Sequence, residues 1–520
     1  FVIRHSSFVI RHSSFVIQPP SRKMTSISNI RTLPQPSVAI LGGGLAGLAA
    51  AVAAVEHGFC VELFEQAPTL GGRAGSYHDP QADQLVDLSP HVAMGCCTNL
   101  LDFCRRTETT DGFDRHATLH FFGPDGIRYD FAASRWLPAP LHLMPGLRRL
   151  GYLTGSECRA IGRAMLRLAR YRELDRADSP TMGQWLHRQN QPENAVRRFW
   201  AVVLESALGD TLDNVSVVAA RKVFVDGFMA TREAYQVLIP RIPLGEIWHR
   251  AGAWLIRRGA KLHTRTRIEQ LEVDGQRVLG IVLGDGTCRR FDHVVSAVSW
   301  KQVGKLLGTE LLRQIPQAEA GTKLDSSPIT AVHLWFDRPI MDLPHAALVG
   351  RLSQWVFQGS RHTPCAVRPM KTADGTRSVP ATSADDTVPA TFHYTVVISA
   401  SHALVGRDSQ EVLQEVLGDL RAVWPMAGEA KLVHHRVLTQ PGAVFSVRPG
   451  SEAIRPLQQT PIEGLYLAGD WTATAWPATM EGAVRSGYLA IEALLVALGR
   501  PESVLIPDLK KGWLTRWIVG

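Results

Sequence analysis

An uncharged stretch near the amino end carries the clearest hydrophobic pattern in the chain. Residues 38–55 contain no charged side chain, and the apolar run 38–41 leads through three glycines into an Ala-rich segment. Eighteen uncharged residues also fit a transmembrane helix. The glycines interrupt the run, however, so the pattern favours a strand, a turn and a helix over about 45–57, with a second strand at 60–64.

The glycines of this turn have the spacing of a dinucleotide-binding site. Gly42, Gly44 and Gly47 form the pattern G-x-G-x-x-G. The first permits a tight turn, the second lets the backbone approach a pyrophosphate, and the third lets the helix pack on the strand. Glu65 ends the second strand, eighteen residues after Gly47. An acid at this place accepts the hydroxyls of the adenosine ribose.

Two later segments alternate between apolar and polar positions as strands do. They cover residues 330–337 and 392–399, and they predict an antiparallel sheet that lines a cavity. Between them, residues 363–389 are rich in Ser, Thr, Ala, Asp and Pro, which predicts a mobile insertion without a catalytic role. Strands are also expected at 259–263 and 267–271, with a hairpin turn at Asp285-Gly286.

Composition narrows the class of protein. The chain has 520 residues, of which 45% are hydrophobic and 20% charged, so two or more globular domains are expected. The net charge of +8 favours anionic partners. Because no nucleic-acid recognition motif occurs, a lipid surface is the expected partner. Seven cysteines without a C-x-x-C pair indicate reduced thiols, and no metal-binding spacing is found.

The first seventeen residues repeat FVIRHSS with a period of seven, and Met24 follows them. We expect residues 1–35 to be a leader that is non-native or disordered. An amphipathic presequence is the alternative. A secretory signal would need a continuous apolar core and a cleavage site with small residues.

Gly71-Gly72-Arg73 follows Glu65 and completes an E-x5-G-G-R pattern. This pattern resembles the flavin-binding amine oxidase and phytoene desaturase superfamily. The resemblance implies that FAD is the cofactor, that the backbone at Ile268 bonds the adenine, and that Gly469-Asp470 and the helix after them complete the site. The residues expected to bind FAD are Gly42, Gly44, Leu45, Ala46, Gly47, Glu65, Gln66, Gly72, Arg73, Ile268, Gly469, Asp470, Thr479 and Met480.

One branch of that superfamily matches further motifs. Asp87, His91, Gly95 and Cys96 have the spacing found in squalene-associated FAD-dependent enzymes, the hydroxysqualene dehydroxylases, although residues 88–90 and Cys97 depart from it. Three further segments, residues 136–147, 185–228 and 467–483, also look like this branch.

The resemblance implies an α/β fold in which a discontinuous Rossmann-type FAD-binding domain carries an α+β substrate domain. The FAD-binding domain is expected to comprise residues 36–105, 240–300 and 460–498. The substrate domain is expected to comprise residues 106–239, which should be helical, and 301–459. Residues 499–520 form a C-terminal tail.

The implied reaction is the reduction of hydroxysqualene to squalene by FADH2, with release of water. The hydroxyl is allylic, so protonating it as it leaves gives a delocalised cation that hydride from flavin N5 can quench. An acid must therefore face the flavin across the substrate. His91 is the first candidate and Asp226 the second. No second nucleotide motif for NAD(P)H is visible, so an external electron donor is expected.

Three other functions remain open. A C30 or C40 carotenoid desaturase would use the same fold with hydride flowing to the flavin. An amine oxidase is disfavoured because the sequence shows neither an aromatic cage nor a flavin-attachment cysteine. A non-catalytic prenyl-lipid carrier would share the fold without using the flavin, and Glu65, Arg73 and Asp470 argue against it.

Two segments are candidates for contact with a membrane. A predicted helix places Arg159, Arg163, Arg167 and Arg170 on one face, which suits either a solvated surface or an anionic bilayer. Residues 509–520 combine tryptophans with cations, which suits either a packed turn or an interfacial anchor. We expect a cytoplasmic protein bound peripherally to the inner face of the cytoplasmic membrane.

Overall fold

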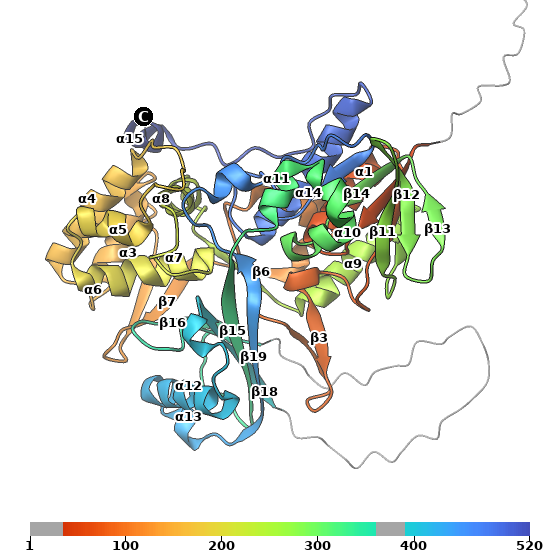
Figure 1. Cartoon of the computed structure of the whole chain (residues 1–520). Helices are drawn as coiled ribbons and strands as arrows, with labels where there is room; N and C mark the ends of the chain where they lie inside the picture. The colour runs from red at the N-terminus through yellow and green to blue at the C-terminus, as the bar shows by residue number, and fades with distance from the viewer. Residues whose placement is uncertain (1–34, 360–390, 520) are drawn as a thin grey trace, which may run out of the picture. The chain divides into compact units, whose positions relative to one another are not determined.

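The computed structural model describes residues 35–359 and 391–519. The predicted insertion at 363–389 and the leader, apart from Gln35, lie outside the described residues. The described residues from Pro36 onward form one unit (Figure 1).

Five parallel strands form the nucleotide-binding sheet, in the order β10-β2-β1-β14-β20. They come from three separate stretches of the chain: β1 (Ser37–Leu41) and β2 (Cys60–Phe64), then β10 (Lys261–His263) and β14 (His293–Ser296), and last β20 (Leu465–Leu467). Ile40 in the central strand lies opposite Leu63 on one side and Val295 on the other, and all three are fully buried. The predicted discontinuous α/β domain is confirmed.

Three helices accompany this sheet: α1 (Leu45–Glu56), α9 (Leu244–Arg257) and α14 (Met480–Ala497). Helix α1 packs against α14 so closely that a Cβ at Gly487 would lie 2.3 Å from the Ala46 carbonyl oxygen. The transmembrane alternative for 38–55 is wrong, because the stretch divides into a strand, a turn and a helix. Among the described residues, no helix is long and apolar enough to cross a membrane.

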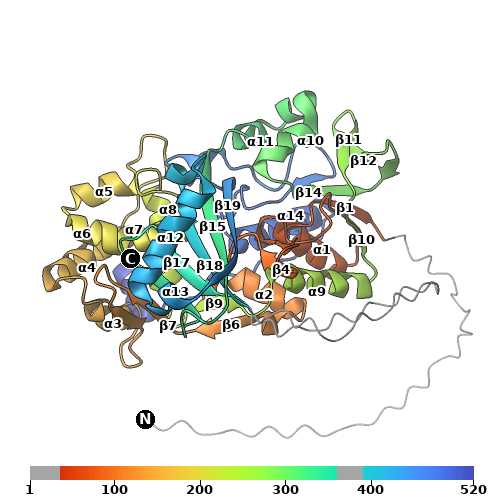
Figure 2. The same cartoon turned by 90° about the horizontal axis from the view of Figure 1, so that it is seen from below.

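The substrate domain is built on a seven-stranded sheet with the order β19-β15-β18-β17-β16-β7-β8. Its strands are β7 (Thr118–Phe122), β8 (Arg128–Ala132), β15 (Ser326–Phe336), β16 (His345–Leu348), β17 (Trp355–Gln358), β18 (Phe392–Ser399) and β19 (Leu432–Phe445). The predicted strands at 330–337 and 392–399 pair antiparallel as β15 and β18. Helix α12 (Ser409–Val423) crosses one face of this sheet, where its buried Leu413 and Leu420 join the core that contains Val332 and Val396 (Figure 2).

The segment 106–239 is only partly helical, which corrects the prediction. Its helices are α3 (Met144–Arg149), α4 (Gly155–Ala169), α5 (Met182–Arg188), α6 (Glu193–Ala195), α7 (Ala201–Leu208) and α8 (Val217–Arg221), with π-helical segments η4 (Val196–Trp200) and η5 (Lys222–Phe228). Strands β6 (Phe113–His116), β7, β8 and β9 (Val237–Pro240) also lie there. A turn joins β7 to β8, with Gly126 at φ +77° and the Gly123 N–H donating to the Ile127 carbonyl (2.9 Å). This Pro-Asp-Gly turn between alternating segments was the available sequence signal.

Further helices and strands complete the fold. They are β3 (Ser76–Asp79), β4 (Gln84–Asp87), β5 (Ala93–Met94), α2 (Thr98–Arg106), β11 (Ile268–Asp274), β12 (Arg277–Leu283), β13 (Cys288–Arg290), α10 (Trp300–Arg313), α11 (Pro316–Gly321), α13 (Met426–Glu429) and α15 (Trp513–Val519). Strands β12 and β13 are joined at the predicted hairpin turn, where the Leu283 N–H donates to the Thr287 carbonyl (2.9 Å).

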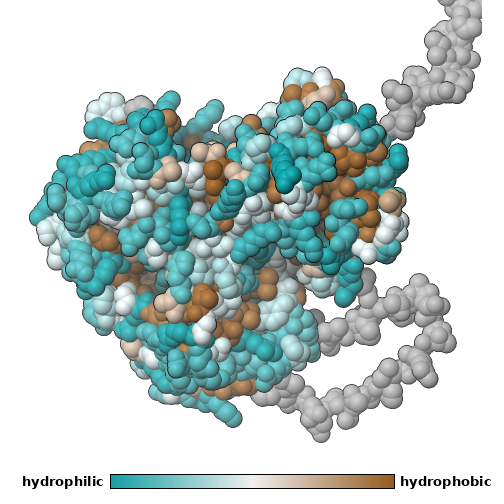
Figure 3. All heavy atoms as spheres, in the orientation of Figure 1, coloured by the Kyte–Doolittle hydropathy of each residue, from teal (hydrophilic) through white to brown (hydrophobic). Residues whose placement is uncertain are grey.

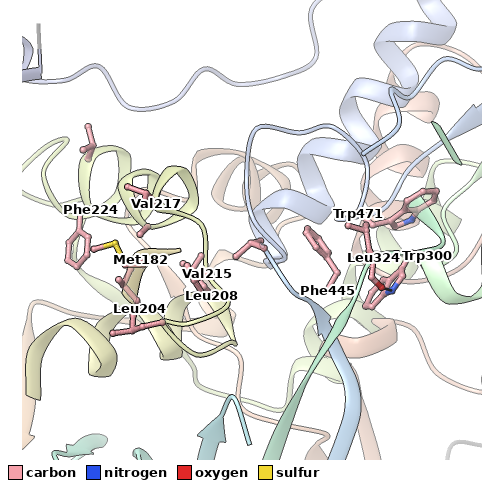
Figure 4. Close-up of a cluster of buried hydrophobic side chains, with 14 of the residues drawn as sticks. Met182, Leu204, Leu208, Val215, Val217, Phe224, Trp300, Leu324, Phe445 and Trp471 are labelled. Atoms are coloured by element: carbon pink, nitrogen blue, oxygen red, sulfur yellow. Dashed lines mark hydrogen bonds between the residues drawn. The ribbon is translucent and has the colours of Figure 1, made fainter. Parts of the chain in front are cut away.

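One buried core joins the helical part of the substrate domain to the base of the FAD-binding domain. Figure 4 shows Met182, Leu204 and Phe224 at one end of it and Trp300 and Trp471 at the other. The indole N–H of Trp300 donates to the Leu324 carbonyl (3.1 Å), and that of Trp471 donates to the Val298 carbonyl (2.9 Å). Because their N–H groups have hydrogen-bond partners, these two buried indoles hold fixed positions beside the site described next.

Candidate active site

The glycine turn after β1 is shaped for a close backbone approach. The Gly42 N–H donates to the Phe64 carbonyl (2.8 Å), with Gly42 at φ +110°. A Cβ at Gly47 would lie 1.9 Å from the Gly42 carbonyl oxygen, so this glycine allows α1 to pack on the turn. Gly44 differs, because a Cβ there would meet only Gly72 Cα, at 3.9 Å. No side chain caps the amino end of α1, so its first N–H groups are available to a phosphate.

Glu65 is held across the glycine turn. Its carboxylate accepts the backbone N–H groups of Gly43 and Ala67, both at 2.7 Å. Since each carboxylate oxygen has a second lone pair, these bonds orient the group and leave acceptor capacity for ribose hydroxyls.

Arg73 and Asp470 join the first and last parts of the FAD-binding domain. Arg73 Nη2 lies 2.5 Å from Asp470 Oδ1, and the guanidinium lies 5.1 Å from the centre of the Trp300 ring. The Asp470 side chain is buried, and its backbone carbonyl accepts a hydrogen bond from Arg455 (2.8 Å). Arg73 is therefore fixed by a charge, an indole face and the Ala443 carbonyl (3.2 Å).

The amino end of α14 closes the site from the other side. Thr479 caps the helix by accepting the Gly482 N–H (3.1 Å). Glu481 is fully buried and accepts the N–H groups of Asn99 and Leu100, while burial raises its pKa. Thr479 and Met480 line the cavity, so the positive end of the helix dipole can stabilise negative charge on a bound flavin.

These groups surround one cavity of about 890 Å3. The predicted residues that line it are Gly42, Gly44, Leu45, Ala46, Glu65, Gln66, Gly72, Arg73, Ile268, Gly469, Asp470, Thr479 and Met480. Gly47 is not among the lining residues, because it faces the Gly42 carbonyl. An open backbone cradle and two helix amino ends fit a pyrophosphate-linked cofactor.

His91 also lines the cavity. Its Nδ1 donates to the Ser89 carbonyl (2.7 Å), because a carbonyl oxygen can only accept. Burial lowers the pKa of His91, and the charge of Arg73 lowers it further. At neutral pH the ring is therefore neutral, with Nε2 as the nitrogen that can accept a proton.

Asp226 does not line the cavity, which corrects its assignment as the second candidate acid. Its carboxylate forms ion pairs with Lys222 (3.1 Å) and Lys511 (2.6 Å). The segment η5 is π-helical, so Gly227 and the neighbouring Val223 reach the cavity instead. The ion pairs give Asp226 a structural position beside the site.

The apolar part of the cavity wall was not predicted residue by residue. It comes from several separate places in the chain, and its aliphatic members include Pro90, Val92, Ala207, Leu208, Val223, Ile329, Val397 and Val444. The alternation of β15 and β18 was the sequence signal for Ile329 and Val397. The buried Cys96 and Cys97 line the cavity as well. In the part of the chain that the structure describes, no group of three His, Cys, Asp or Glu residues is arranged to hold a metal ion.

Comparison with known proteins identifies the family to which this chain belongs. The model of the family described as flavin containing amine oxidoreductase matches residues 45–495. The chain belongs to this family. As a flavin amine oxidoreductase family member, it is a flavin-dependent oxidoreductase with FAD as its cofactor, and the residues above are those that would hold FAD.

Two named relatives of this family member are desaturases. The chain is 25% identical over 507 residues to a 15-cis-phytoene desaturase from Solanum lycopersicum, which covers 92% of this chain and 82% of the relative. It is also 25% identical over 500 residues to a zeta-carotene desaturase from Synechocystis, which covers 90% and 99%.

Solved structures share the fold. An oxidoreductase from Methanosarcina mazei has a TM-score of 0.64 at 17% identity, covering 88% of this chain and 100% of that one. A putrescine oxidase bound to putrescine has a TM-score of 0.64 at 15% identity, covering 89% and 99%. At these identities the likeness concerns the fold alone.

Proposed function

We propose that this flavoprotein exchanges hydride with a long isoprenoid hydrocarbon, and that it catalyses desaturation. The observation that carries the proposal is the apolar wall that continues directly from the FAD cradle. Aliphatic side chains form most of this wall; Trp300 and Trp476 also line the cavity, with Arg73 and Lys222 over their rings. Lys222, which also lines the cavity, is neutralised by ion pairs with Asp226 and Asp508.

Such a wall suits a hydrocarbon better than an amine. A cationic substrate would need carboxylates or an aromatic cage to replace its hydration. Glu65 and Asp470 are engaged by backbone groups and by Arg73, and Glu481 is engaged by α2. The cavity therefore offers apolar contact and the exclusion of water.

The cofactor and one side chain would each carry out one part of the desaturation. Bound FAD supplies hydride acceptance. Desaturation removes a hydride from one carbon and a proton from its neighbour, and a carbon–carbon double bond forms between them. His91 Nε2 is in the state that accepts this proton, since Nδ1 already carries the hydrogen donated to Ser89.

The relatives support the same direction. Both named proteins are carotene desaturases, and each alignment covers most of both chains. The proposed substrate class is therefore a C30 or C40 polyene or its saturated precursor.

Reductive dehydroxylation of hydroxysqualene is the second candidate. Its support is that His91 and Cys96, which match the motif of that branch, and residues of η5 contribute to the cavity wall. The departing hydroxyl would require a proton donor, whereas His91 is held in its neutral form. Protonation of His91 would have to accompany substrate binding for this direction to operate.

Two incubations distinguish the directions. Oxidised enzyme is given 15-cis-phytoene or squalene, and chemically reduced enzyme is given hydroxysqualene, both without oxygen. New conjugated absorbance in the first supports the proposal. Squalene formed only in the second shows the dehydroxylase. A purified protein that cannot be loaded with FAD and turns over neither substrate would indicate a prenyl-lipid carrier instead.

A further inference from the structure

We infer that the loop 134–143 and the C-terminal segment 509–519 together form a docking surface for an anionic lipid bilayer. We call these two segments the lipid-facing surface. The inference rests on the proposed function only in that an isoprenoid substrate would be drawn from a membrane.

The lipid-facing surface holds the three most exposed tryptophans among the described residues. Their exposed fractions are 79% for Trp136, 68% for Trp513 and 74% for Trp517. Other tryptophans, such as Trp200 and Trp248, are fully buried, so the fold can shelter an indole. Leu141 is exposed on the same loop. Hydrophilic residues cover most of the face shown in Figure 3, with hydrophobic patches between them. Exposed tryptophans are typical of the boundary between lipid headgroups and acyl chains.

The two segments are held against each other by the core. A Cβ at Gly512 would lie 4.0 Å from the Ala139 carbonyl, and the Gly512 N–H donates to the Ala230 carbonyl (3.2 Å). Arg232 donates to the Leu137 carbonyl (3.2 Å). Both segments therefore meet at residues 230–232.

Helix α15 is packed and exposed at the same time. Thr515, Ile518 and Val519 are buried, and the Thr515 hydroxyl donates to the Met229 carbonyl (3.0 Å). Arg170 at the end of α4 donates to the Ile518 carbonyl (3.2 Å). The sequence left open whether this segment is a packed turn or an interfacial anchor. The inner side of α15 is packed, while Trp513 and Trp517 are exposed and can contact a membrane interface.

The charge of the lipid-facing surface favours an anionic partner. The lipid-facing surface contains four Arg or Lys residues, Arg135, Lys510, Lys511 and Arg516, and no Asp or Glu. Lys511 pairs with Asp226, and none of the other three takes part in an ion pair within the described residues. Cations beside tryptophans complement anionic headgroups, whereas a second copy of this cationic surface would repel it.

The surface is continuous with the wall of the FAD cavity. Trp476 and Lys222 line the cavity, and both bind Asp508, through the indole N–H (3.1 Å) and an ion pair (2.7 Å). Five residues further along the chain is Trp513. A lipid leaving the bilayer at α15 would thus reach the cavity across the segment 508–511.

The test uses full-length FAD-loaded protein and sucrose-loaded vesicles, either phosphatidylcholine alone or phosphatidylcholine with phosphatidylglycerol. The protein is expected to sediment with the anionic vesicles, less so as salt is added. Trp513→Ala with Trp517→Ala should weaken binding on the order of tenfold, because less apolar area enters the interface. Lys510→Ala with Arg516→Ala should weaken it about 25-fold, about fivefold for each charge.

Control variants carry changes of the same kind elsewhere. Leu457→Ala with Ile256→Ala removes apolar residues with exposed fractions of 59% and 58%, and Arg313→Ala with Lys323→Ala removes two exposed cations. Both should bind vesicles as the wild type does. Equal binding to neutral vesicles, or no difference between the surface and control variants, would overturn the inference. So would a lipid-free dimer that the tryptophan variant dissociates, since a second copy would then be the occupant.

Vesicle binding is measured without substrate, so it can fail while the proposed desaturation stands. Turnover of detergent-dispersed substrate can likewise fail while binding stands.

Discussion

Arg73 and Asp470 are 397 positions apart in the chain and form an ion pair in the wall of the FAD cavity. The Asp470 side chain is buried, so the pair is shielded from water on one side. It fixes both the Gly-Gly-Arg turn and the Gly-Asp turn.

Arg73→Met should weaken FAD binding by about 10- to 100-fold, which corresponds to about 1.5–3 kcal/mol for a hydrogen bond to a charged group. The loss follows because the variant leaves Asp470 buried and unpaired. FAD titration followed by flavin fluorescence measures it. Arg289→Met is the control, because Arg289 pairs with the partly buried Glu62 (2.7 Å) but does not line the cavity. An equal loss of FAD in both variants would contradict the role given to Arg73.

Substitutions at Gly47 and Gly44 should affect folding and cofactor binding separately. Gly47→Ala places a Cβ 1.9 Å from the Gly42 carbonyl, so the cofactor-free protein should melt well below the wild type or fail to fold. Gly44→Ala meets only an ordinary contact at 3.9 Å, so it should fold normally and bind FAD weakly, because the methyl group occupies the phosphate path. Thermal denaturation without FAD and FAD titration together check both. Normal FAD affinity in Gly44→Ala would show that the pyrophosphate lies elsewhere.

Asp87 should make the protein less stable as pH rises from about 4 to 6. Burial raises its pKa to about 6, whereas in the unfolded chain an aspartate titrates near 4. The folded state therefore holds the proton more tightly, and its contribution is full below pH 4 and lost by pH 6, about 3 kcal/mol in all.

Asp87→Asn removes this titration, so its melting temperature should rise relative to the wild type between pH 4.5 and pH 7. Asp292 serves as the opposite case. The Ser37 N–H and hydroxyl donate to it and lower its pKa, so its contribution is lost as pH falls. If the Asp87→Asn difference stayed constant with pH, Asp87 would not be the titrating group.

His91→Ala should lower kcat by about 10²- to 10⁴-fold without loss of FAD, as expected for a general base. In the wild type, kcat should be flat near neutrality and fall only at a pH below the ordinary histidine pKa, because the pKa of His91 is lowered. The variant should lack this acid limb. Asp226→Asn is the control and should keep kcat within about twofold, because Asp226 faces Lys222 and Lys511. An acid limb that persists in His91→Ala would exclude His91 as the base.

The sequence predicted the elements around the glycine turn well, because local spacing determines them. Strand β2 has the predicted bounds, and α1 and α14 begin where the motifs placed them. A glycine turn, a helix amino end and an acid at the end of a strand are all defined within about thirty residues. Only tertiary packing decides the direction of a side chain, and there the prediction for Asp226 failed. The π-helical turn at η5 and a lysine from the C-terminal segment, far away in the chain, direct its carboxylate away from the cavity.

The apolar wall could not be predicted in full for the same reason. Alternation identified β15 and β18, but Ala207, Leu208 and Val223 lie in helices whose hydrophobic residues could equally have been core. The hairpin of β7 and β8 was not predicted, because residues 106–239 were expected to be helical.

The order of the five parallel strands has a consequence for biosynthesis. Strand β20, Asp470 and the amino end of α14 all lie beyond residue 464, although the glycine turn they complete is within the first fifty residues. A nascent chain emerging from the ribosome therefore presents half of a cofactor cradle long before the other half exists. Cofactor loading must wait until β20 and the start of α14 have been synthesised, and a chain released before them would never acquire its flavin.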